Sequence, residues 1–231
     1  MVGGWRCLVC GANADDPRPF WCPRCGAVSS YSRVVHSPAF APPRRRPVKA
    51  SDLGGGKLAP SLGRWDDLFG RVGRPIKLLV FGPPGSLKTT CALLLAEAFK
   101  VWGPVLYVAA DEGPESQSFK DKIGRLEVLS PYIMSGSWAE VSAELSNGGW
   151  SLVVLDSANR IGVVPGELDA YTNSLRLSWL VLLEVTKAGD FRGDASWPHW
   201  ADIVLYTDGK CVNVEKSRYG QAGKKQEVLS A

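Results

Sequence analysis

The sequence predicts an α/β fold, in which a mostly parallel sheet is flanked by helices and a small cysteine-bearing module comes first. Three observations lead to this prediction. From about residue 59 onward, short apolar runs alternate with stretches of helix-forming residues. A glycine-containing loop, GPPGSLKTT, stands between one apolar run and one helix-forming stretch. Four of the six cysteines fall within the first 26 residues.

The chain is expected to divide into a four-cysteine module over residues 1–33, a Pro-, Arg- and Gly-rich linker over 34–58, and an α/β domain over 59–231. The expected strands are Ile76–Phe81, Val105–Ala109, Leu152–Leu155, Trp179–Val185, Ile203–Tyr206 and Val212–Lys216. The expected helices are Thr89–Val101, part of Ser116–Leu126, and Trp138–Ser146. A short Thr-Asp-Gly-Lys turn between the last two strands predicts a hairpin at the sheet edge.

The loop GPPGSLKTT almost fits the phosphate-binding pattern G-x-x-x-x-G-K-[ST]. Gly82, Lys88 and Thr89 match the pattern, but Leu87 stands where it asks for glycine. In such a loop backbone N–H groups hold phosphate, the lysine reaches the β- and γ-phosphates, and the hydroxyl binds Mg²⁺. Because glycine is needed where φ is positive, Leu87 can take its place if its φ is negative in this loop. The alternative is a chance Gly/Pro loop with a surface lysine. The expected nucleotide contacts are Gly82, Pro83, Pro84, Gly85, Ser86, Leu87, Lys88, Thr89 and Thr90.

Acidic residues end two of the expected strands. Asp156 closes the apolar run SLVVLDS, as a Walker B carboxylate does, and is expected to support Mg²⁺ together with Thr89. Asp111 and Glu112 follow the run VLYVAA, where a carboxylate can polarise the attacking water of an ATPase. The alternative for this pair is a solvated loop without a catalytic role.

Two cations close the last expected strand. Lys216 and Arg218 are two residues apart, so on an extended chain they point the same way. Cations in this position suit a triphosphate. In a ring-shaped ATPase they would reach into the site of the neighbouring subunit, as an arginine finger does.

The first four cysteines form two C-x2-C pairs, each followed by glycine. Four thiolates in this arrangement predict a tetrahedral, structural Zn²⁺ site that would supply the folding energy of a segment too short to build a core. Two disulfides and a redox-active pair are the alternatives. The predicted zinc ligands are Cys7, Cys10, Cys22 and Cys25.

Composition indicates an ordinary soluble protein, with 45% hydrophobic and 22% charged residues. The chain lacks both an apolar run of about 18 residues and the apolar core of a signal peptide, so we expect a cytoplasmic protein. Its first 50 residues carry eight Lys or Arg against two Asp, which suggests a polyanionic partner. The run Arg44–Arg46 either contacts DNA phosphates or is simply solvated. Trp65 and Trp102 are candidates to stack on a base, whereas Cys91 and Cys211 are expected in the core.

Taken in order, these segments resemble the bacterial RadA (Sms) family of RecA-like ATPases. The resemblance covers CLVCG…FWCPRCGAVSSY, SLGRWDDLFG, GPPGSLKTT, VLYVAADE, LVVLDS, EVTKAG, HWADIVLY and KSRYG. It implies a RecA-like core behind a four-cysteine zinc finger. It also implies a DNA-dependent ATPase of recombination and repair that uses ATP, Mg²⁺ and Zn²⁺ and binds single-stranded or branched DNA. The expected assembly is a hexameric ring, with a recombinase or replication protein as partner, and Lys216 and Arg218 acting in DNA-coupled hydrolysis.

Several positions depart from the family pattern. Leu87 replaces glycine, Ser217 and Tyr219 replace Asn and Phe in the K-N-R-F-G signature, and Glu184 replaces a histidine. The chain ends at Ala231, so we expect a shortened member without the C-terminal Lon-protease-like domain. Two other functions stay open: a replicative-type ring helicase with the same core, and an annealing or switch protein that binds ATP and DNA with little turnover.

Overall fold

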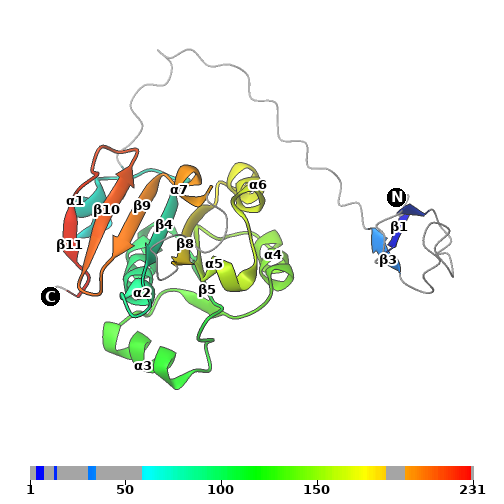
Figure 1. Cartoon of the computed structure of the whole chain (residues 1–231), viewed down its shortest axis with the longest axis horizontal. Coiled ribbons are helices and arrows are strands. Elements are labelled where there is room, and N and C mark those ends of the chain that lie inside the picture. Colours follow the sequence, from blue (N-terminus) through cyan, green and yellow to red (C-terminus); the bar gives the residue numbers. More distant parts are fainter. Residues whose placement is uncertain (1–3, 8–12, 15–30, 35–58, 186–195, 230–231) are drawn as a thin grey trace, which may run out of the picture. The chain divides into compact units, whose positions relative to one another are not determined.

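The computed structural model describes residues 4–7, 13–14, 31–34, 59–185 and 196–229, and for the first three ranges it describes the backbone alone. The chain forms two compact units, Met1–Pro47 and Val48–Ala231 (Figure 1). In the first unit, strand β1 (Gly4–Cys7) pairs antiparallel with β2 (Asn13–Ala14) on one side and with β3 (Tyr31–Val34) on the other.

The second unit is built on an eight-stranded sheet in the order β11-β10-β9-β4-β8-β7-β5-β6. The strands are β4 (Lys77–Gly82), β5 (Val105–Ala109), β6 (Tyr132–Met134), β7 (Leu152–Asp156), β8 (Ser178–Glu184), β9 (Ile203–Thr207), β10 (Cys211–Ser217) and β11 (Lys225–Glu227). All neighbours from β9 to β6 are parallel, whereas β10 runs antiparallel to β9 and β11 antiparallel to β10. The predicted α/β fold with a mostly parallel sheet is thus confirmed, and it is the fold of a RecA-like core.

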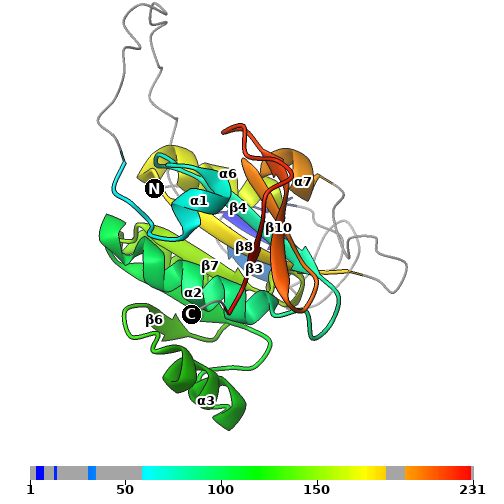
Figure 2. The ribbon, with the colours of Figure 1, turned by 90° about the vertical axis from the view of Figure 1, so that its left-hand side faces the viewer.

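Helices cover both faces of the sheet (Figures 1 and 2). They are α1 (Trp65–Phe69), α2 (Lys88–Phe99), α3 (Gln117–Leu126), α4 (Trp138–Ser146), α5 (Ala158–Ile161), α6 (Pro165–Leu175) and α7 (Trp197–Trp200), with a 3₁₀ turn at Lys100–Trp102. Alternate residues of each strand face opposite sides, so a single strand serves two cores. In β4, Leu78 and Val80 join the core under α1 and α2, whereas Leu79 joins the core under α4 to α7.

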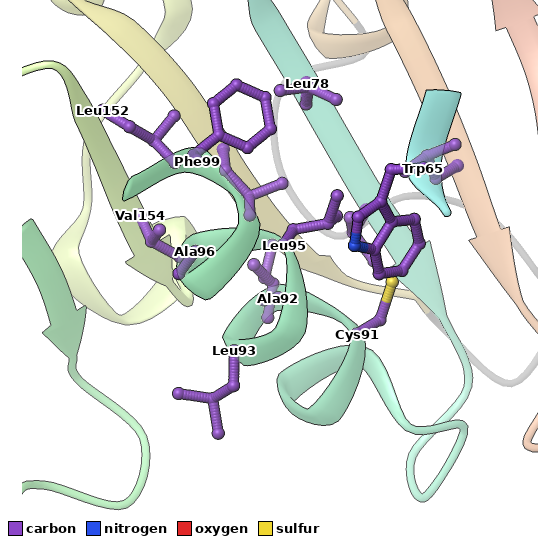
Figure 3. Close-up of a cluster of buried hydrophobic side chains, with 14 of the residues drawn as sticks. Trp65, Leu78, Cys91, Ala92, Leu93, Leu95, Ala96, Phe99, Leu152 and Val154 are labelled. Carbon is purple, nitrogen blue, oxygen red and sulfur yellow. The ribbon is translucent and has the colours of Figure 1, made fainter. Parts of the chain in front are cut away.

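Helix α2 is the central helix of the first core, because most of its side chains are apolar and small enough to pack closely. Figure 3 shows Ala92, Leu95 and Ala96 of α2 between Trp65 and the strand residues Leu152 and Val154. Its apolar composition is the reason that α2 lies against the sheet, with its first turn at the end of β4.

All six predicted strands and all three predicted helices of the α/β domain are present, as is the hairpin of β9 and β10. Cys91 and Cys211 are buried, as expected. The suggestion that Trp65 stacks on a base is wrong, because its side chain is 2% exposed in the core. Trp102 packs edge-on against Phe99 beyond the far end of α2. In the ranges that the structure describes, no helix has the length and apolarity needed to cross a membrane.

Candidate nucleotide site

Residues 82–90, called the P-loop below, join the end of β4 to the start of α2. This strand–loop–helix arrangement is the one the sequence predicts. Since β4 lies between the parallel strands β9 and β8, the loop sits at the edge of the sheet where the carboxyl ends of the parallel strands meet. Ligands of open α/β folds bind at this edge, and a helix N-terminus there attracts anions.

The backbone of Leu87 corrects one prediction. Its φ is 67° and its ψ is 23°, in the left-handed region, so the condition of a negative φ under which leucine could replace glycine is not met. The loop therefore keeps the conformation that glycine would adopt freely, and a leucine adopts it at a cost of about 1–2 kcal/mol. The Leu87 side chain packs against the core under α2, which offsets part of this cost.

The start of the P-loop is held by the end of β9. Thr207 Oγ1 lies 2.8 Å from Ser86 Oγ and donates to the carbonyl of Phe81. A methyl group on Gly82 would lie 2.4 Å from the Thr207 carbonyl oxygen, so only glycine allows this close approach. Gly209, in the turn after β9, also lies against the loop, since a methyl group there would be 3.9 Å from the Ser86 Cα.

A cavity of about 530 Å³ opens in front of the P-loop. This volume lies in the range of sites that take a small-molecule ligand. Its lining carries four carboxylates and three cations. The charged residues are Asp111, Glu112, Asp156, Glu184, Lys88, Lys122 and Arg125.

Asp156 meets Thr89 at the end of β7. The Thr89 side chain hydrogen-bonds to the Asp156 carboxylate, which also accepts a 2.6 Å bond from the Tyr107 hydroxyl. Burial raises the pKa of Asp156 to about 6, and the two hydrogen bonds and the charge of Lys122 oppose that shift. A hydroxyl and a carboxylate side by side are the protein ligands that Mg²⁺ uses beside nucleotide phosphates.

Mg²⁺ sites of this kind need few protein ligands, because phosphates and water complete them. Within 59–185 and 196–229, no three His, Cys, Asp or Glu side chains gather into a group that could hold a metal alone.

Lys88 lies within the cavity, and its Nζ donates to the carbonyls of Gly82 and Pro83 at 2.9 Å each. Burial lowers the pKa of Lys88, while the charges of Asp156, Glu184 and Asp111 act in the opposite direction. The ammonium is thus placed where a phosphate bound by the loop would lie.

Both candidate catalytic carboxylates line the cavity, and each has a cationic partner. Asp111 lies 3.1 Å from Nε of Arg160 and accepts a hydrogen bond from Ser157. Glu112 lies 3.0 Å from Nζ of Lys122. The structure thus brings both carboxylates to the same cavity.

The structure places Lys216 and Arg218 away from this cavity. Ser217, between them, pairs with Ile203 of β9, which in turn pairs with Leu78 near the start of β4. The P-loop follows the other end of β4, roughly 13 Å further along the strand direction. Lys216 and Arg218 are therefore at the opposite edge of the sheet from Lys88.

At that edge both cations bind groups of their own chain. Lys216 Nζ donates to the carbonyls of Pro198 and Ala201 at 2.7 Å and of His199 at 3.4 Å, at the end of α7. Arg218 forms a 3.1 Å ion pair with Asp202.

Sequence reasoning missed four residues of the site. The sequence predicts Tyr107 only as a strand residue and Thr207 only as the first residue of the hairpin turn. It predicts Lys122 and Arg125 only as helix residues. Their positions depend on which strands and helices become neighbours, which no local pattern reports. A polar residue at the end of an apolar strand, as Thr207 is, was the one available signal.

The predicted zinc ligands lie outside the residues whose side chains the structure describes. Cys7 ends β1 in the backbone trace, and Cys10, Cys22 and Cys25 fall in ranges that are not described. Thr186 and Lys187 of the stretch EVTKAG are also outside them.

The sequence is similar to several bacterial proteins named DNA repair protein RadA. It is 24% identical to that of Chlamydia pneumoniae over 94% of this chain and 54% of the relative. It is 24% identical to that of Streptococcus pyogenes serotype M6 over 86% of this chain and 51% of the relative. It is 27% identical to that of Campylobacter jejuni over 57% of this chain and 33% of the relative.

The chain spans about half the length of the first two of these relatives. No protein-family model matches it. The similarity to the Chlamydia pneumoniae protein nevertheless covers 94% of this chain, and the sheet and P-loop have the arrangement that the resemblance implied. The chain is therefore a RadA-like protein, built on a RecA-like α/β core.

Proposed function

We propose that this protein is a DNA-dependent ATPase of homologous recombination and DNA repair. The observation that carries the proposal is the meeting of Lys88, Thr89 and Asp156 at one cavity in front of a helix N-terminus. ATP-hydrolysing P-loop proteins bind phosphate with such a lysine and Mg²⁺ with such a hydroxyl and carboxylate. The DNA and repair part of the proposal is supported by the names of the relatives.

In this proposal each group of the cavity has a defined task. The P-loop N–H groups and Lys88 bind the phosphates of ATP, while Thr89 and Asp156 hold Mg²⁺, which neutralises phosphate charge. Asp111 or Glu112 orients the attacking water and accepts its proton. Replacing each by its amide separates them: the catalytic one is expected to lose about 10²-fold or more in turnover with little change in ATP affinity.

Lys216 and Arg218 fit this proposal only as residues acting on a neighbouring subunit. Because they lie at the edge opposite their own P-loop, a ring or filament in which this edge meets the next cavity would bring them to phosphate. We therefore propose a homo-oligomeric ring, a hexamer, in which ATP binds between subunits and its hydrolysis drives branch migration or translocation on single-stranded or branched DNA. A recombinase or replication protein is the proposed partner, in the cytoplasm.

The N-terminal unit is proposed to bind one Zn²⁺ through Cys7, Cys10, Cys22 and Cys25 and to engage DNA or the partner. A small antiparallel sheet with Cys7 at a strand end suits such a module, since the metal supplies the folding energy. Metal analysis of the purified chain should find one Zn²⁺ per protein, and the quadruple Cys→Ser variant should contain none.

The test is ATP hydrolysis by the zinc-loaded protein with and without single-stranded DNA. We expect stimulation by DNA and its loss in Lys88→Ala. The matched control is Lys100→Ala, because Lys100 lies just beyond the other end of α2 and pairs with Glu97. Hydrolysis at the normal rate in Lys88→Ala would overturn the assignment of the site.

Two other outcomes would change the function rather than the site. Unwinding of long duplexes without a recombinase would favour a ring helicase. Tight ATP binding with DNA-stimulated turnover far below about 1 per second would favour an annealing or switch protein.

A further inference from the structure

Helix α3 brings two cations to the nucleotide cavity that lie outside the P-loop motif. The helix lies beyond the edge of the sheet next to β6 (Figure 2), and its buried side chain is Phe119. Lys122 and Arg125 are three residues apart, so they lie on one side of α3. Both line the cavity together with the P-loop.

Lys122 is held close to the catalytic carboxylates. Its side chain is only 18% exposed, and its Nζ lies 3.0 Å from Oε2 of Glu112. Its charge also reaches Asp156, whose burial-raised pKa it lowers. The ammonium therefore lies in the cavity beside the carboxylate of Glu112, which follows β5, and within electrostatic reach of Asp156 at the end of β7.

Arg125 is exposed on the same side of the helix, one turn further along. Unlike the Lys122 ammonium, the Arg125 guanidinium makes no ion pair or hydrogen bond with any residue that the structure describes. A guanidinium with its donors available beside a P-loop is suited to phosphate, which it can bind through two parallel hydrogen bonds.

The balance of charged side chains in the cavity also supports a role for these two cations in binding phosphate. Its four carboxylates outnumber its three cations, and Lys88 is the one cation that the P-loop itself provides. Without the two cations of α3, a triphosphate entering this cavity would meet four carboxylates and one cation, whereas with them it meets four carboxylates and three cations.

Resting on the proposed function, we propose that Lys122 and Arg125 of α3 bind the terminal phosphate of ATP within the same subunit. Phosphate competes with Glu112 for the Lys122 ammonium. ATP then frees the Glu112 carboxylate, whereas a nucleotide without a terminal phosphate leaves the Lys122–Glu112 pair intact. The α3 cations thus make the site selective for ATP over ADP.

A purely structural role for Lys122 makes a different prediction. If the ion pair only fixes the loop between β5 and α3, its loss would change ATP and ADP affinity equally. If Lys122 and Arg125 bind the terminal phosphate, ATP affinity falls and ADP affinity does not. The ratio of the two affinities therefore distinguishes the two roles.

The experiment measures dissociation constants for ATP and ADP by displacement of a fluorescent nucleotide, at fixed salt and Mg²⁺. We expect Lys122→Gln and Arg125→Gln each to weaken ATP binding about tenfold and ADP binding by less than about threefold. Lys122→Arg should retain most of the ATP affinity of the unmodified protein, because it keeps a cation at this position.

The matched control is Lys120→Gln. Lys120 lies on the same helix, pairs with the exposed Glu115, and does not line the cavity. Its ATP and ADP affinities should match those of the unmodified protein.

If Lys122→Gln and Arg125→Gln bind ATP as tightly as the unmodified protein does, and Lys88→Ala loses ATP binding, the α3 assignment is overturned and the proposed function is not. Equal weakening of ATP and ADP would also overturn it, in favour of the structural role. A chain that binds no nucleotide at all would overturn the proposed function, and the α3 assignment with it.

Discussion

Thr207 Oγ1 at the end of β9 lies 2.8 Å from Ser86 Oγ in the P-loop, and both residues are buried. The two hydroxyls connect segments 121 residues apart in the sequence. Since Thr207 also donates to the Phe81 carbonyl, one hydroxyl fixes both the last residues of β4 and the loop that follows.

Replacing Thr207 by valine keeps the shape of the side chain and removes these bonds. We expect a loss of about 1–3 kcal/mol in the free energy of unfolding, because buried polar partners are left unsatisfied. ATP affinity should also fall, since the loop loses a support. Chemical denaturation and nucleotide binding measure the two effects.

Thr172→Val is the control for this prediction. Thr172 is buried too and bonds to the Leu168 carbonyl and the Trp179 indole, away from the cavity. It should lose stability without losing ATP affinity. An unchanged ATP affinity in Thr207→Val would show that the loop holds its shape without β9.

Asp156 predicts a dependence of stability on pH. Its pKa is about 6 in the folded protein against 3.8 for an ordinary aspartate. Between these values the folded state keeps a proton that the unfolded state has released, so stability falls as pH rises from about 4 to about 6, by up to about 3 kcal/mol. Asp156→Asn removes this contribution.

Urea denaturation without Mg²⁺ at several pH values tests this prediction. From pH 4 to 7, the unmodified protein should lose stability relative to Asp156→Asn. Asp121→Asn, on the exposed side of α3, should follow the unmodified protein. Parallel curves for Asp156→Asn and the unmodified protein would contradict the prediction. Asp156→Asn is also expected to lose Mg²⁺-dependent hydrolysis.

Leu87 predicts which substitutions the P-loop tolerates. Leu87→Gly should change stability by no more than about 1 kcal/mol, because release from the left-handed conformation offsets the lost packing. ATP affinity should stay within about threefold, since the backbone N–H groups keep their places. Leu87→Ile should lose about 2 kcal/mol or more, because a β-branched residue rarely adopts a positive φ.

Leu94→Ile is the matched control, since Leu94 packs against the same core from an ordinary position in α2. It should lose less than about 1.5 kcal/mol. If Leu87→Ile binds ATP and unfolds like Leu94→Ile, the left-handed backbone at position 87 is of no consequence. Thermal unfolding and ATP titration of the three variants decide this.

Lys216 and Arg218 are expected to differ in their effect on stability. Lys216→Met leaves three carbonyls at the end of α7 without their donor and should lose about 1–2 kcal/mol. Arg218→Met removes an ion pair in which the arginine is 60% exposed and should lose less than about 1 kcal/mol. Denaturant unfolding at low protein concentration measures both.

The same two variants also distinguish a structural role of each cation from a role in the site of a neighbouring subunit. If Arg218→Met loses DNA-stimulated ATP hydrolysis but keeps its stability, Arg218 acts in the site of a neighbouring subunit. Unchanged stability in Lys216→Met would mean that its bonds to α7 are dispensable.

Much of the fold could be predicted because the apolar runs and the P-loop are local signals. The runs before Gly82 and Asp156 are uninterrupted, as strands buried on both faces are. The strands β6 and β11, of three residues each, are too short for such a signal. Helix α6 begins with Pro165 and carries mostly polar residues, so its sequence reads as a loop.

The site was predictable only where chemistry and sequence position coincide. Lys88, Thr89 and Asp156 are recognisable by spacing, whereas Lys122 and Arg125 reach the cavity only because the loop after β5 turns α3 toward it. The positive φ of Leu87 could not be predicted from the sequence either. The loop imposes a conformation on whatever residue stands there, and side-chain preference gives way to that tertiary constraint.

The hairpin of β9 and β10 runs from the end of the sheet where the P-loop lies to the opposite end, where β4 begins. Its turn touches the P-loop through Thr207 and Gly209, and its open end carries Lys216 and Arg218. Tightly packed, hydrogen-bonded strands transmit displacement rather than absorb it. In the proposed ring, a single hairpin would therefore connect the P-loop of each subunit to the two cations that face the neighbouring subunit.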